Sequence, residues 1–300
     1  MHIPVLQKEV IEYLDPKPNE NFIDCTIDGG GHTAAILEKI SPQGKVLGID
    51  LDPELLKAAE IKNQKAKIKN RLILVNDNFS NLKSIVARER FRPIQGILFD
   101  LGMSSWHLEE SKRGFSFQRE EPLDMRYNTE FSILTAEKIV NEYSPKEIEK
   151  ILKEYGEERF SGEIVNQIIK ERKLKPIKTT FDLNEIIKKA VPKNYERGRI
   201  HPATRTFQAL RIAVNNEIEN FENALPQALE ILKEGGRLAV ISFHSLEDRI
   251  IKNFLKDSNQ QNLIKILTKK PIKPTEQEIQ TNKRSRSAKL RAAIKLCHIV

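Results

Sequence analysis

A glycine-rich loop followed by an acidic residue is the clearest chemical pattern in the sequence. The loop, Asp28-Gly29-Gly30-Gly31-His32, separates a predicted strand at 21–27 from a predicted helix at 33–40. Glycines in such a loop let the backbone approach a ligand and adopt positive φ angles. Asp50 ends the next predicted strand, where a carboxylate accepts hydrogen bonds from ribose hydroxyls in nucleotide-type sites. The pattern predicts such a site, and the alternative is a tight turn followed by a helix cap.

The same loop bears on the class of cofactor. A full dinucleotide fingerprint needs a third glycine, and Thr33 or Ala34 occupies that place. A nicotinamide cofactor is therefore disfavoured. S-adenosylmethionine fits better, because it needs a ribose acceptor and a close backbone approach but carries no pyrophosphate.

Two further predicted strands end in polar residues. Phe79 follows the strand at 71–75 and offers an aromatic face to an adenine, and Asp100 follows the strand at 94–99. The carboxyl ends of parallel strands meet at one sheet edge. In methyl transfer to an exocyclic amine, Asp100 would accept hydrogen bonds from the amine and favour a pyramidal nitrogen. The alternative is that Asp100 only holds the cofactor.

Element patterns predict an α/β fold with an insertion. Strands alternate with helices in the first third, no strand signal appears between about 109 and 193, and a strand returns at 235–242. We expect a Rossmann-like core formed by 1–108 and 200–300, with a basic C-terminal segment, and an inserted all-helical domain at 109–199 that recognises the substrate.

Positive charge is concentrated near the C-terminus. The chain has 50 basic and 42 acidic residues, a surplus of +8, and most of that surplus lies in 269–300. Such a segment is typical either of a phosphate-binding surface, with Arg284 and Arg286 as candidates, or of a solvated tail. Apolar residues alternate along 290–296, so part of the segment is also a candidate edge strand.

Other candidate substrate contacts combine cations with aromatic or polar groups. Arg113 and Phe115 could clamp a splayed base, or Phe115 could simply pack in the helical lobe. A helix beginning near Pro202 places Arg205 and Gln208 one turn apart on a single face. The full set of candidates in these segments is Arg113, Phe115, His201, Arg205, Gln208, Arg211 and His244.

Several classes of protein are disfavoured. The two cysteines, Cys25 and Cys297, form no metal-ligand spacing, and no HExxH motif is present, so we expect no metal site. No apolar run approaches the roughly 18 residues of a membrane span, and the N-terminus lacks a signal-peptide pattern. We therefore expect a cytoplasmic protein without membrane contact.

Long motifs in order along the chain resemble the bacterial RsmH (MraW) methyltransferase family. They are HIPVL (2–6), DGGGHT (28–33), DLGMSS (100–105), RGFSF (113–117), PLDMR (122–126), YGEE (155–158), HPATRTFQALRI (201–212), SFHSLEDR (242–249) and RSRSAKLR (284–291). The resemblance implies S-adenosylmethionine-dependent methylation of the N4 amine of cytidine 1402 in small-subunit (16S) ribosomal RNA. It also implies a Rossmann-like core with a helical domain inserted after the fourth strand.

The resemblance also implies a set of cofactor contacts, and the chain departs from the family pattern at two positions. The implied contacts are Gly30, Gly31, His32, Asp50, Phe79, Asp100 and His107. Asp28 stands where the family usually has glycine, and His107 stands where it usually has glutamine. Imidazole can replace an amide as a hydrogen-bonding group, but with a pH dependence of its own.

Two other functions compete with this hypothesis. One is methylation of a small molecule or a protein, which the basic tail and inserted lobe argue against. The other is a non-catalytic RNA-binding assembly factor, which the acids Asp50 and Asp100 argue against. The sequence leaves open whether the protein is a monomer or a homodimer, and whether naked 16S RNA or an assembled small subunit is the partner.

Overall fold

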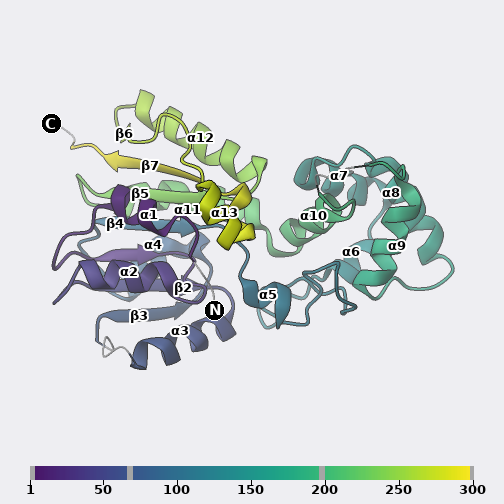
Figure 1. Cartoon of the computed structure of the whole chain (residues 1–300), viewed down its shortest axis with the longest axis horizontal. Helices are drawn as coiled ribbons and strands as arrows, with labels where there is room; N and C mark the ends of the chain where they lie inside the picture. Colours follow the sequence, from purple (N-terminus) through teal and green to yellow (C-terminus); the bar gives the residue numbers. More distant parts are fainter. Residues whose placement is uncertain (1–3, 66–69, 196–199, 298–300) are drawn as a thin grey trace. The chain divides into compact units, whose positions relative to one another are not determined.

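The computed structural model describes residues 4–65, 70–195 and 200–297, and the chain divides into two compact units. The core unit comprises Met1–Gly102 and Ile218–Val300, and the inserted unit comprises Met103–Glu217. Figure 1 shows both along the chain, with the inserted unit in teal and green. We expected the insertion to end at 199, next to the undescribed residues 196–199. It extends to 217, because helix α10 (Thr204–Asn215) packs against α7 (Pro145–Gly156) of the inserted unit.

One mixed sheet of seven strands forms the centre of the core unit in the described part of the chain. Its spatial order is β3-β2-β1-β4-β5-β7-β6. The strands are β1 (Phe22–Asp24), β2 (Val46–Asp50), β3 (Leu72–Asn76), β4 (Gly96–Asp100), β5 (Arg237–Ser242), β6 (Ile264–Ile266) and β7 (Lys289–Lys295). The pairs from β3 to β5 are parallel, and β7 runs antiparallel to both β5 and β6. The expected α/β Rossmann-like core is confirmed.

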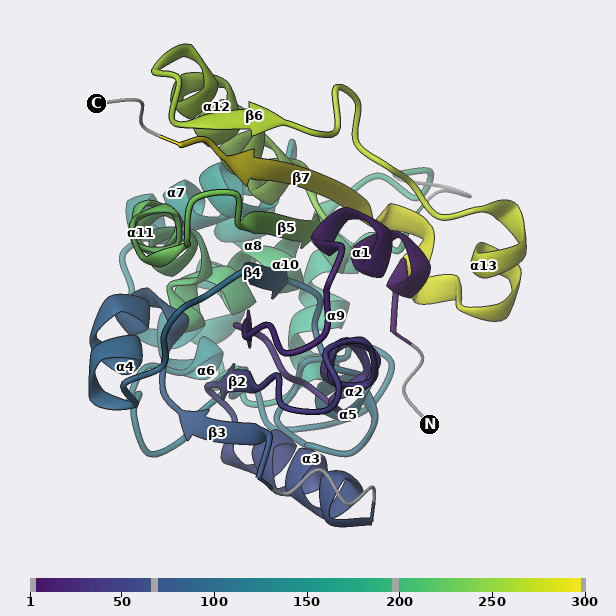
Figure 2. The same cartoon turned by 90° about the vertical axis from the view of Figure 1, so that its left-hand side faces the viewer.

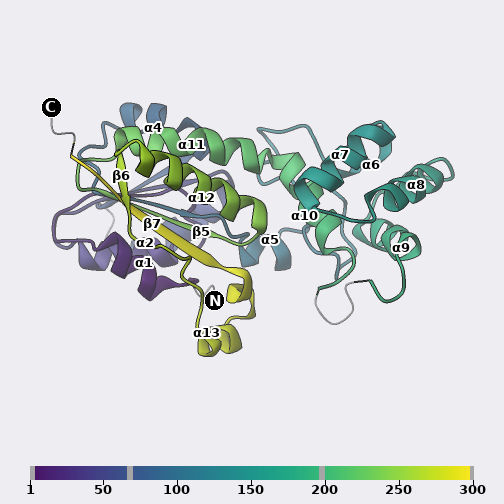
Figure 3. The ribbon, with the colours of Figure 1, turned by 90° about the horizontal axis from the view of Figure 1, so that it is seen from above.

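Helices cover both faces of the sheet, and strand residues alternate between them. One face carries α4 (Leu82–Arg88), α11 (Glu217–Ile231) and α12 (Ser245–Gln260), and the other carries α1 (Gln7–Leu14), α2 (Gly31–Lys39) and α3 (Pro53–Lys65). Figures 2 and 3 show α4 and α11 on one side of the sheet, with α1 and α2 on the other. Within β4, Ile97 and Phe99 pack toward the first layer and Leu98 packs toward the second, as the period of two requires.

The regular elements described in the inserted unit are helices, and a single isolated β-bridge joins Pro122 to Thr179. It contains α5 (Ser105–Glu109), α6 (Ala136–Glu142), α7, α8 (Ser161–Arg172), α9 (Thr180–Ala190) and α10 around one apolar core. Capping boxes at Ser144 and Thr179 explain where α7 and α9 begin, because each side chain satisfies a free backbone N–H of the first turn. Among the described helices of either unit, none is long and apolar enough to cross a membrane.

Two local predictions need correction. The helix predicted to begin near Pro202 begins at Thr204, and Asn216, with a φ of 50°, ends it before α11 begins. The alternating segment at 290–296, expected as an edge strand, lies inside the sheet as β7 between β5 and β6. Its neighbour in the chain, the short helix α13 (Glu276–Thr281), leads into the 3₁₀ helix η2 (Lys283–Ser287).

Candidate active site

The five parallel strands described in the core unit end in polar residues at the same edge of the sheet. β1 ends at Asp24, β2 at Asp50, β3 at Asn76, β4 at Asp100 and β5 at Ser242. The residues before these ends are mostly apolar and pack between two helical layers, buried in β1, β2 and β4 and partly buried in β3. This edge is where open α/β sheets bind their ligands.

The glycine loop forms a sharp turn between β1 and α2. Gly30 precedes α2 with φ 71°, and its backbone N–H donates to the Ile27 carbonyl at 2.7 Å. A Cβ at Gly31 would lie 2.2 Å from Cγ of Pro4, so only glycine fits there. Asp28, which replaces the usual family glycine, has φ 45°, a left-handed conformation that aspartate tolerates better than most side chains. Aspartate at this position is therefore compatible with the left-handed backbone of the loop.

Asp50 faces the loop from the end of β2. One carboxylate oxygen accepts the Asp28 backbone N–H at 3.0 Å, and the other accepts that of Asp52 at 2.9 Å. Burial raises the pKa of Asp50 to about 7, and the neighbouring carboxylates of Asp28 and Asp52 also raise it against these two hydrogen bonds. The side chain is thus held rigidly, in an orientation set by the glycine loop.

A buried cluster joins β1, β4 and the first turn of α2. His32 Nε2 lies 3.4 Å from Asp100 Oδ2, and both side chains are mostly buried. Beside them, Thr33 Oγ1 donates to Asp24 Oδ2 at 2.6 Å, and the Asp100 backbone N–H donates to Thr26 Oγ1 at 2.7 Å. The cluster therefore ties the glycine loop to the end of β4.

Charges in the cluster shift two titrations. Burial raises the pKa of Asp24 to about 6, although the hydrogen bond from Thr33 and the nearby His32 lower it. Burial disfavours protonation of His32, but the partner Asp100, together with the charges of Asp24 and Asp28, outweighs burial and raises the pKa of His32. Asp24 and His32 thus both have shifted pKa values at the carboxyl edge of the sheet, and such shifts are typical of functional sites.

Phe79 begins a 3₁₀ helix, η1 (Phe79–Asn81), directly after β3. Its ring meets Phe99 edge-on, with centroids 5.6 Å apart and an interplanar angle of 87°. Asn78 fixes the turn by accepting the Ser80 backbone N–H at 2.9 Å. The ring is only partly buried, as an adenine-contacting side chain would be.

His107 belongs to the inserted unit, unlike the six other predicted cofactor contacts. It is buried on α5, where its ring lies 5.0 Å from the Phe115 centroid and 4.8 Å from the Tyr127 centroid. Phe115 in turn stacks on Tyr127 at 5.4 Å. Phe115 is therefore packed inside the inserted unit, which is the second of the two roles considered for it above. A role for either residue in binding stays a prediction.

Arg113 supports the same aromatic cluster. Its Nη1 donates to the carbonyl oxygens of Tyr127 at 2.7 Å and Arg126 at 3.3 Å, and its guanidinium lies 5.1 Å from the centre of the Trp106 ring. These contacts fix the loop that precedes α6. Contact with RNA stays a prediction for this residue.

Two candidate substrate contacts on α10, Arg205 and Gln208, bind the end of α7 instead of extending into solvent. Arg205 Nη1 donates to the carbonyl oxygens of Gly156 at 3.4 Å and Glu157 at 3.3 Å, and Gln208 Nε2 donates to that of Tyr155 at 3.0 Å. These carbonyls lie at the C-terminus of α7, where no further helical N–H can reach them.

The two other candidates near α10 also have partners inside the inserted unit. Arg211 forms a two-point ion pair with Glu217, at 2.8 and 2.9 Å. His201 stacks on Phe117 at 4.4 Å, and its Nδ1 accepts the Ala203 backbone N–H at 3.2 Å. Burial, assisted by Lys188, lowers the pKa of His201. Each of the four residues has a structural role, and RNA contact stays a prediction for all of them.

His244 caps helix α12 of the core unit. Its Nδ1 accepts the Glu247 backbone N–H at 3.4 Å, while Glu247 Oε1 lies 2.9 Å from its Nε2. Glu247 completes the capping box by accepting the backbone N–H of His244 at 3.3 Å. This accounts for the position of His244 after β5, and substrate contact stays a prediction.

The basic C-terminal segment separates into two sets of residues. Lys289 and Arg291 on β7 pair with Asp248 at 3.0 and 2.7 Å, and Lys295 binds carbonyl oxygens at the end of α11. The remaining cations are exposed and lie between β6 and β7. We call them the basic surface: Lys269, Lys270, Lys273, Lys283, Arg284 and Arg286.

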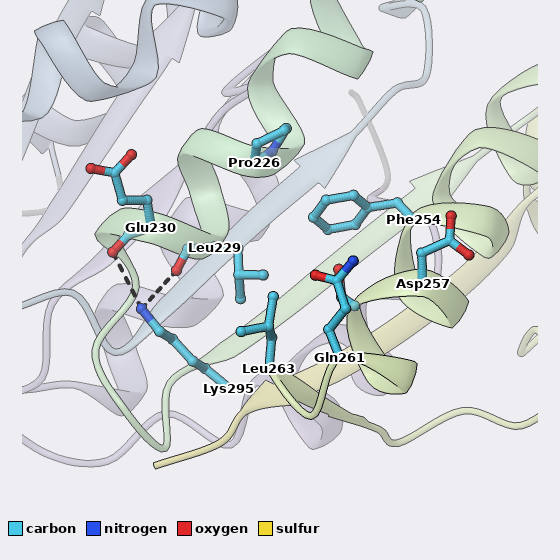
Figure 4. Close-up of a pocket in the computed structure, with 9 residues that line it drawn as sticks. Pro226, Leu229, Glu230, Phe254, Asp257, Gln261, Leu263 and Lys295 are labelled. Atoms are coloured by element: carbon cyan, nitrogen blue, oxygen red, sulfur yellow. Dashed lines mark hydrogen bonds between the residues drawn. The ribbon is translucent and has the colours of Figure 1, made fainter. Parts of the chain in front are cut away.

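A cavity of about 440 Å³ lies between α11 and α12, on the face of the sheet opposite to α2. Figure 4 shows Leu229, Phe254 and Leu263 on its walls, with Lys295 bound to backbone oxygens of Leu229 and Glu230. No residue predicted to bind cofactor or substrate is among its lining residues.

Sequence reasoning missed Asp24 and Thr33 as members of the site. A signal was present, because Asp24 is the only acid in the predicted strand at 21–27, which leads into the glycine loop. An acid in that position either needs a hydrogen-bond partner or keeps its proton. The structure supplies the partner in Thr33.

The chain matches known proteins over almost its whole length. The model of the MraW methylase family matches residues 1–296. "Ribosomal RNA small subunit methyltransferase H" of Heliobacterium modesticaldum is 47% identical over 311 residues, covering 98% of each chain. The protein of the same name from Clostridium botulinum is 44% identical over 310 residues, covering 98% of this chain and 99% of its own.

A solved structure agrees at the level of fold. The crystal structure of a methylase from Clostridium thermocellum aligns with a TM-score of 0.51 and 14% identity, covering 99% of this chain and 100% of that one. By its full-length match, the chain belongs to the MraW methylase family of RsmH-type methyltransferases, and it is an S-adenosylmethionine-dependent methyltransferase.

Proposed function

We propose that the protein methylates the N4 amine of cytidine 1402 in 16S ribosomal RNA, in the cytoplasm, with S-adenosylmethionine as methyl donor. The observation that carries the proposal is the convergence of the glycine loop, Asp50 and Asp100 on one edge of the sheet. The names of the relatives support a small-subunit ribosomal RNA as substrate.

The residues present fit the cofactor. Each carboxylate oxygen can accept two hydrogen bonds, and each oxygen of Asp50 accepts one backbone N–H, so both retain an acceptor site for a ribose hydroxyl. The backbone at Gly30 and Gly31 would lie along the methionine part, and Phe79 would contact the adenine. Bound there, the cofactor supplies a methyl group activated by a sulfonium.

Asp100 would act on the acceptor amine. The lone pair of an exocyclic amine is delocalised into the cytosine ring, so it is a weak nucleophile. A carboxylate that accepts hydrogen bonds from the amine favours the pyramidal nitrogen of the transition state. Asp100 is held for this by its backbone bond to Thr26 and by the Gly102 N–H, which lies 3.4 Å from Oδ1.

The basic surface would bind the RNA backbone, and the inserted unit would recognise the substrate. All six cations of the basic surface are exposed, and the segment that carries them is fixed to the core. Glu278 Oε1 accepts the Leu6 backbone N–H at 2.7 Å, and Ser285 is fully buried. A backbone that is already ordered loses little conformational entropy when the cations it carries bind phosphates.

Transfer of a labelled methyl group tests the proposal. Purified protein with labelled S-adenosylmethionine should label 16S RNA or small subunits that lack the modification, and digestion should place the label at cytidine 1402. RNA carrying uridine at this position is the matched control and should remain unlabelled. Label at another base, or on protein, would contradict the proposal, and comparison of RNA with subunits identifies the preferred substrate.

A further inference from the structure

Hydrogen bonding within the fold does not satisfy the imidazole of His32 in its contact with Asp100. Nε2 of His32 and Oδ2 of Asp100 face each other at 3.4 Å, longer than the roughly 2.7–2.9 Å of a charge-assisted hydrogen bond. Nδ1 of His32 is buried and has no hydrogen-bond partner among the described residues. A buried imidazole that only stabilised the fold would have satisfied partners.

The surroundings of His32 favour a positive charge despite its burial. The carboxylates of Asp100 on β4, Asp24 on β1 and Asp28 in the loop all act on the ring. The first turn of α2 contains no acidic residue, and the amide of Gln7 on α1 donates to the Gly31 carbonyl at 3.0 Å. The positive end of the helix dipole of α2 also disfavours a charged imidazole in the first turn. The three carboxylates must therefore outweigh both burial and the helix dipole for the pKa of His32 to rise.

We propose that His32 is a positioning residue that shares a proton with Asp100, so that the pair, rather than the carboxylate alone, takes up the proton released by the substrate amine. This inference rests on the proposed function. The proton would reach Oδ2 of Asp100 first and then Nε2 of His32. Closing of the 3.4 Å gap would accompany the second step, because imidazolium and carboxylate attract each other.

The balance of the reaction requires such an acceptor. The amine nitrogen uses its lone pair to form the N–C bond, and the C–S bond breaks with its electron pair remaining on sulfur. The methylated nitrogen then carries one proton more than the product. Asp100 lies at the carboxyl edge of the sheet, where the amine would bind under the proposed function. His32 Nε2 faces the carboxylate of Asp100 with no residue between them.

A titration of the unliganded protein tests the pairing without any turnover. Two-dimensional NMR of the imidazole nitrogens should give His32 a pKa above the ordinary value of about 6.5. Asp100→Asn should lower that pKa strongly, and Asp28→Gly, which suits the left-handed backbone, should lower it less. His201 is the internal control and should not move. An unchanged His32 titration in Asp100→Asn would overturn the proposal.

Single-turnover kinetics at saturating cofactor test the role in the reaction. In the wild type the rate should rise with pH and level off above the pKa of His32. His32→Gln should lower the plateau by about tenfold to a hundredfold and remove that limb of the profile. An unaltered profile and rate in His32→Gln would overturn the proposal. A wild type that methylates no RNA would instead contradict the proposed function, while the NMR result would still decide the pairing.

Discussion

At the scale of single residues, the raised pKa of Asp50 connects cofactor binding to pH. A carboxylate accepts hydrogen bonds from ribose hydroxyls best when ionised, and Asp50 ionises at a pKa of about 7 in the free protein. Binding must therefore release a proton at lower pH. The dissociation constant of S-adenosylmethionine, measured by calorimetry, should fall as pH rises from 6 to 8 and then level off.

Asp50→Asn should remove this pH dependence and weaken binding. A hydrogen bond to a charged group contributes about 1.5–3 kcal/mol, so we expect a loss of affinity of roughly 10- to 150-fold at pH 8. Asp77→Asn is the matched control, because Asp77 follows the neighbouring strand and binds Asn81 and Arg88. Equal affinity of the Asp50→Asn variant and the wild type would contradict the placement of the ribose.

Asp100 has two candidate roles that separate kinetically. If it acts on the amine, Asp100→Asn should lower the single-turnover rate by more than it lowers cofactor affinity, because the amide cannot accept a proton. Rapid-quench measurements over a range of cofactor concentrations check this. Full recovery of the rate at saturating S-adenosylmethionine would show that Asp100 only holds the cofactor.

The strand-end acids were predictable from the sequence, whereas their partners were not. Asp50 and Asp100 each follow an apolar run of strand length, and sheet geometry alone brings such ends together. The approach of His32 to Asp100 depends on how α2 packs against β1 and β2, which places its first turn beside the end of β4. No periodicity in the sequence contains that information.

At the scale of elements, α10 stabilises the inserted unit through the end of α7. Arg205→Ala or Gln208→Ala would leave carbonyl oxygens of Tyr155, Gly156 or Glu157 without their donors. Urea unfolding should show a loss of about 1–2 kcal/mol for each variant. Lys150→Ala on the exposed side of α7 is the control, expected within about 0.5 kcal/mol of the wild type. Unchanged stability of both variants would indicate that these bonds contribute nothing and would strengthen an RNA-contacting role.

The spacing of Arg205 and Gln208 predicts that they share one helix face, and the structure agrees that both side chains reach the same target. The target itself was not predictable, because a shared polar face is equally suited to solvent, RNA or the free carbonyls of another helix. The alternating pattern at 290–296 likewise predicts an element but not its partners. It predicts a strand, but whether one or both of its edges are paired depends on β6, whose three residues give little signal.

At the scale of the whole molecule, RNA binding should depend on where the positive charges lie more than on the net charge of the chain. Lys289, Arg291 and Lys295 contribute to the net charge of the tail but are bound within the fold. A triple substitution of Lys283, Arg284 and Arg286 by alanine should therefore weaken RNA binding and reduce the log–log salt slope by up to about three units, roughly one for each phosphate that is no longer neutralised.

The matched control for this variant is a triple substitution by alanine of exposed cations of the core unit, Lys17, Lys39 and Lys45, which lie near the amino ends of β1 and β2. Affinity for S-adenosylmethionine and melting temperature should be unchanged in the basic-surface variant, because its three side chains are exposed. Filter binding at several salt concentrations measures the slope. A slope equal to that of the wild type would contradict phosphate binding by this surface.

The interior position of β7 also has a consequence for the birth of the protein on the ribosome. In chain order β7 is the last strand of the sheet, yet it pairs on both sides, with β5 and β6. While residues 289–295 are still inside the exit tunnel, the neighbouring edge of β5 has no partner, and unpaired strand edges promote aggregation. The nascent core can thus complete its sheet only after residues 289–295 have left the tunnel, and until then the edge of β5 is open to pairing with strands of other chains.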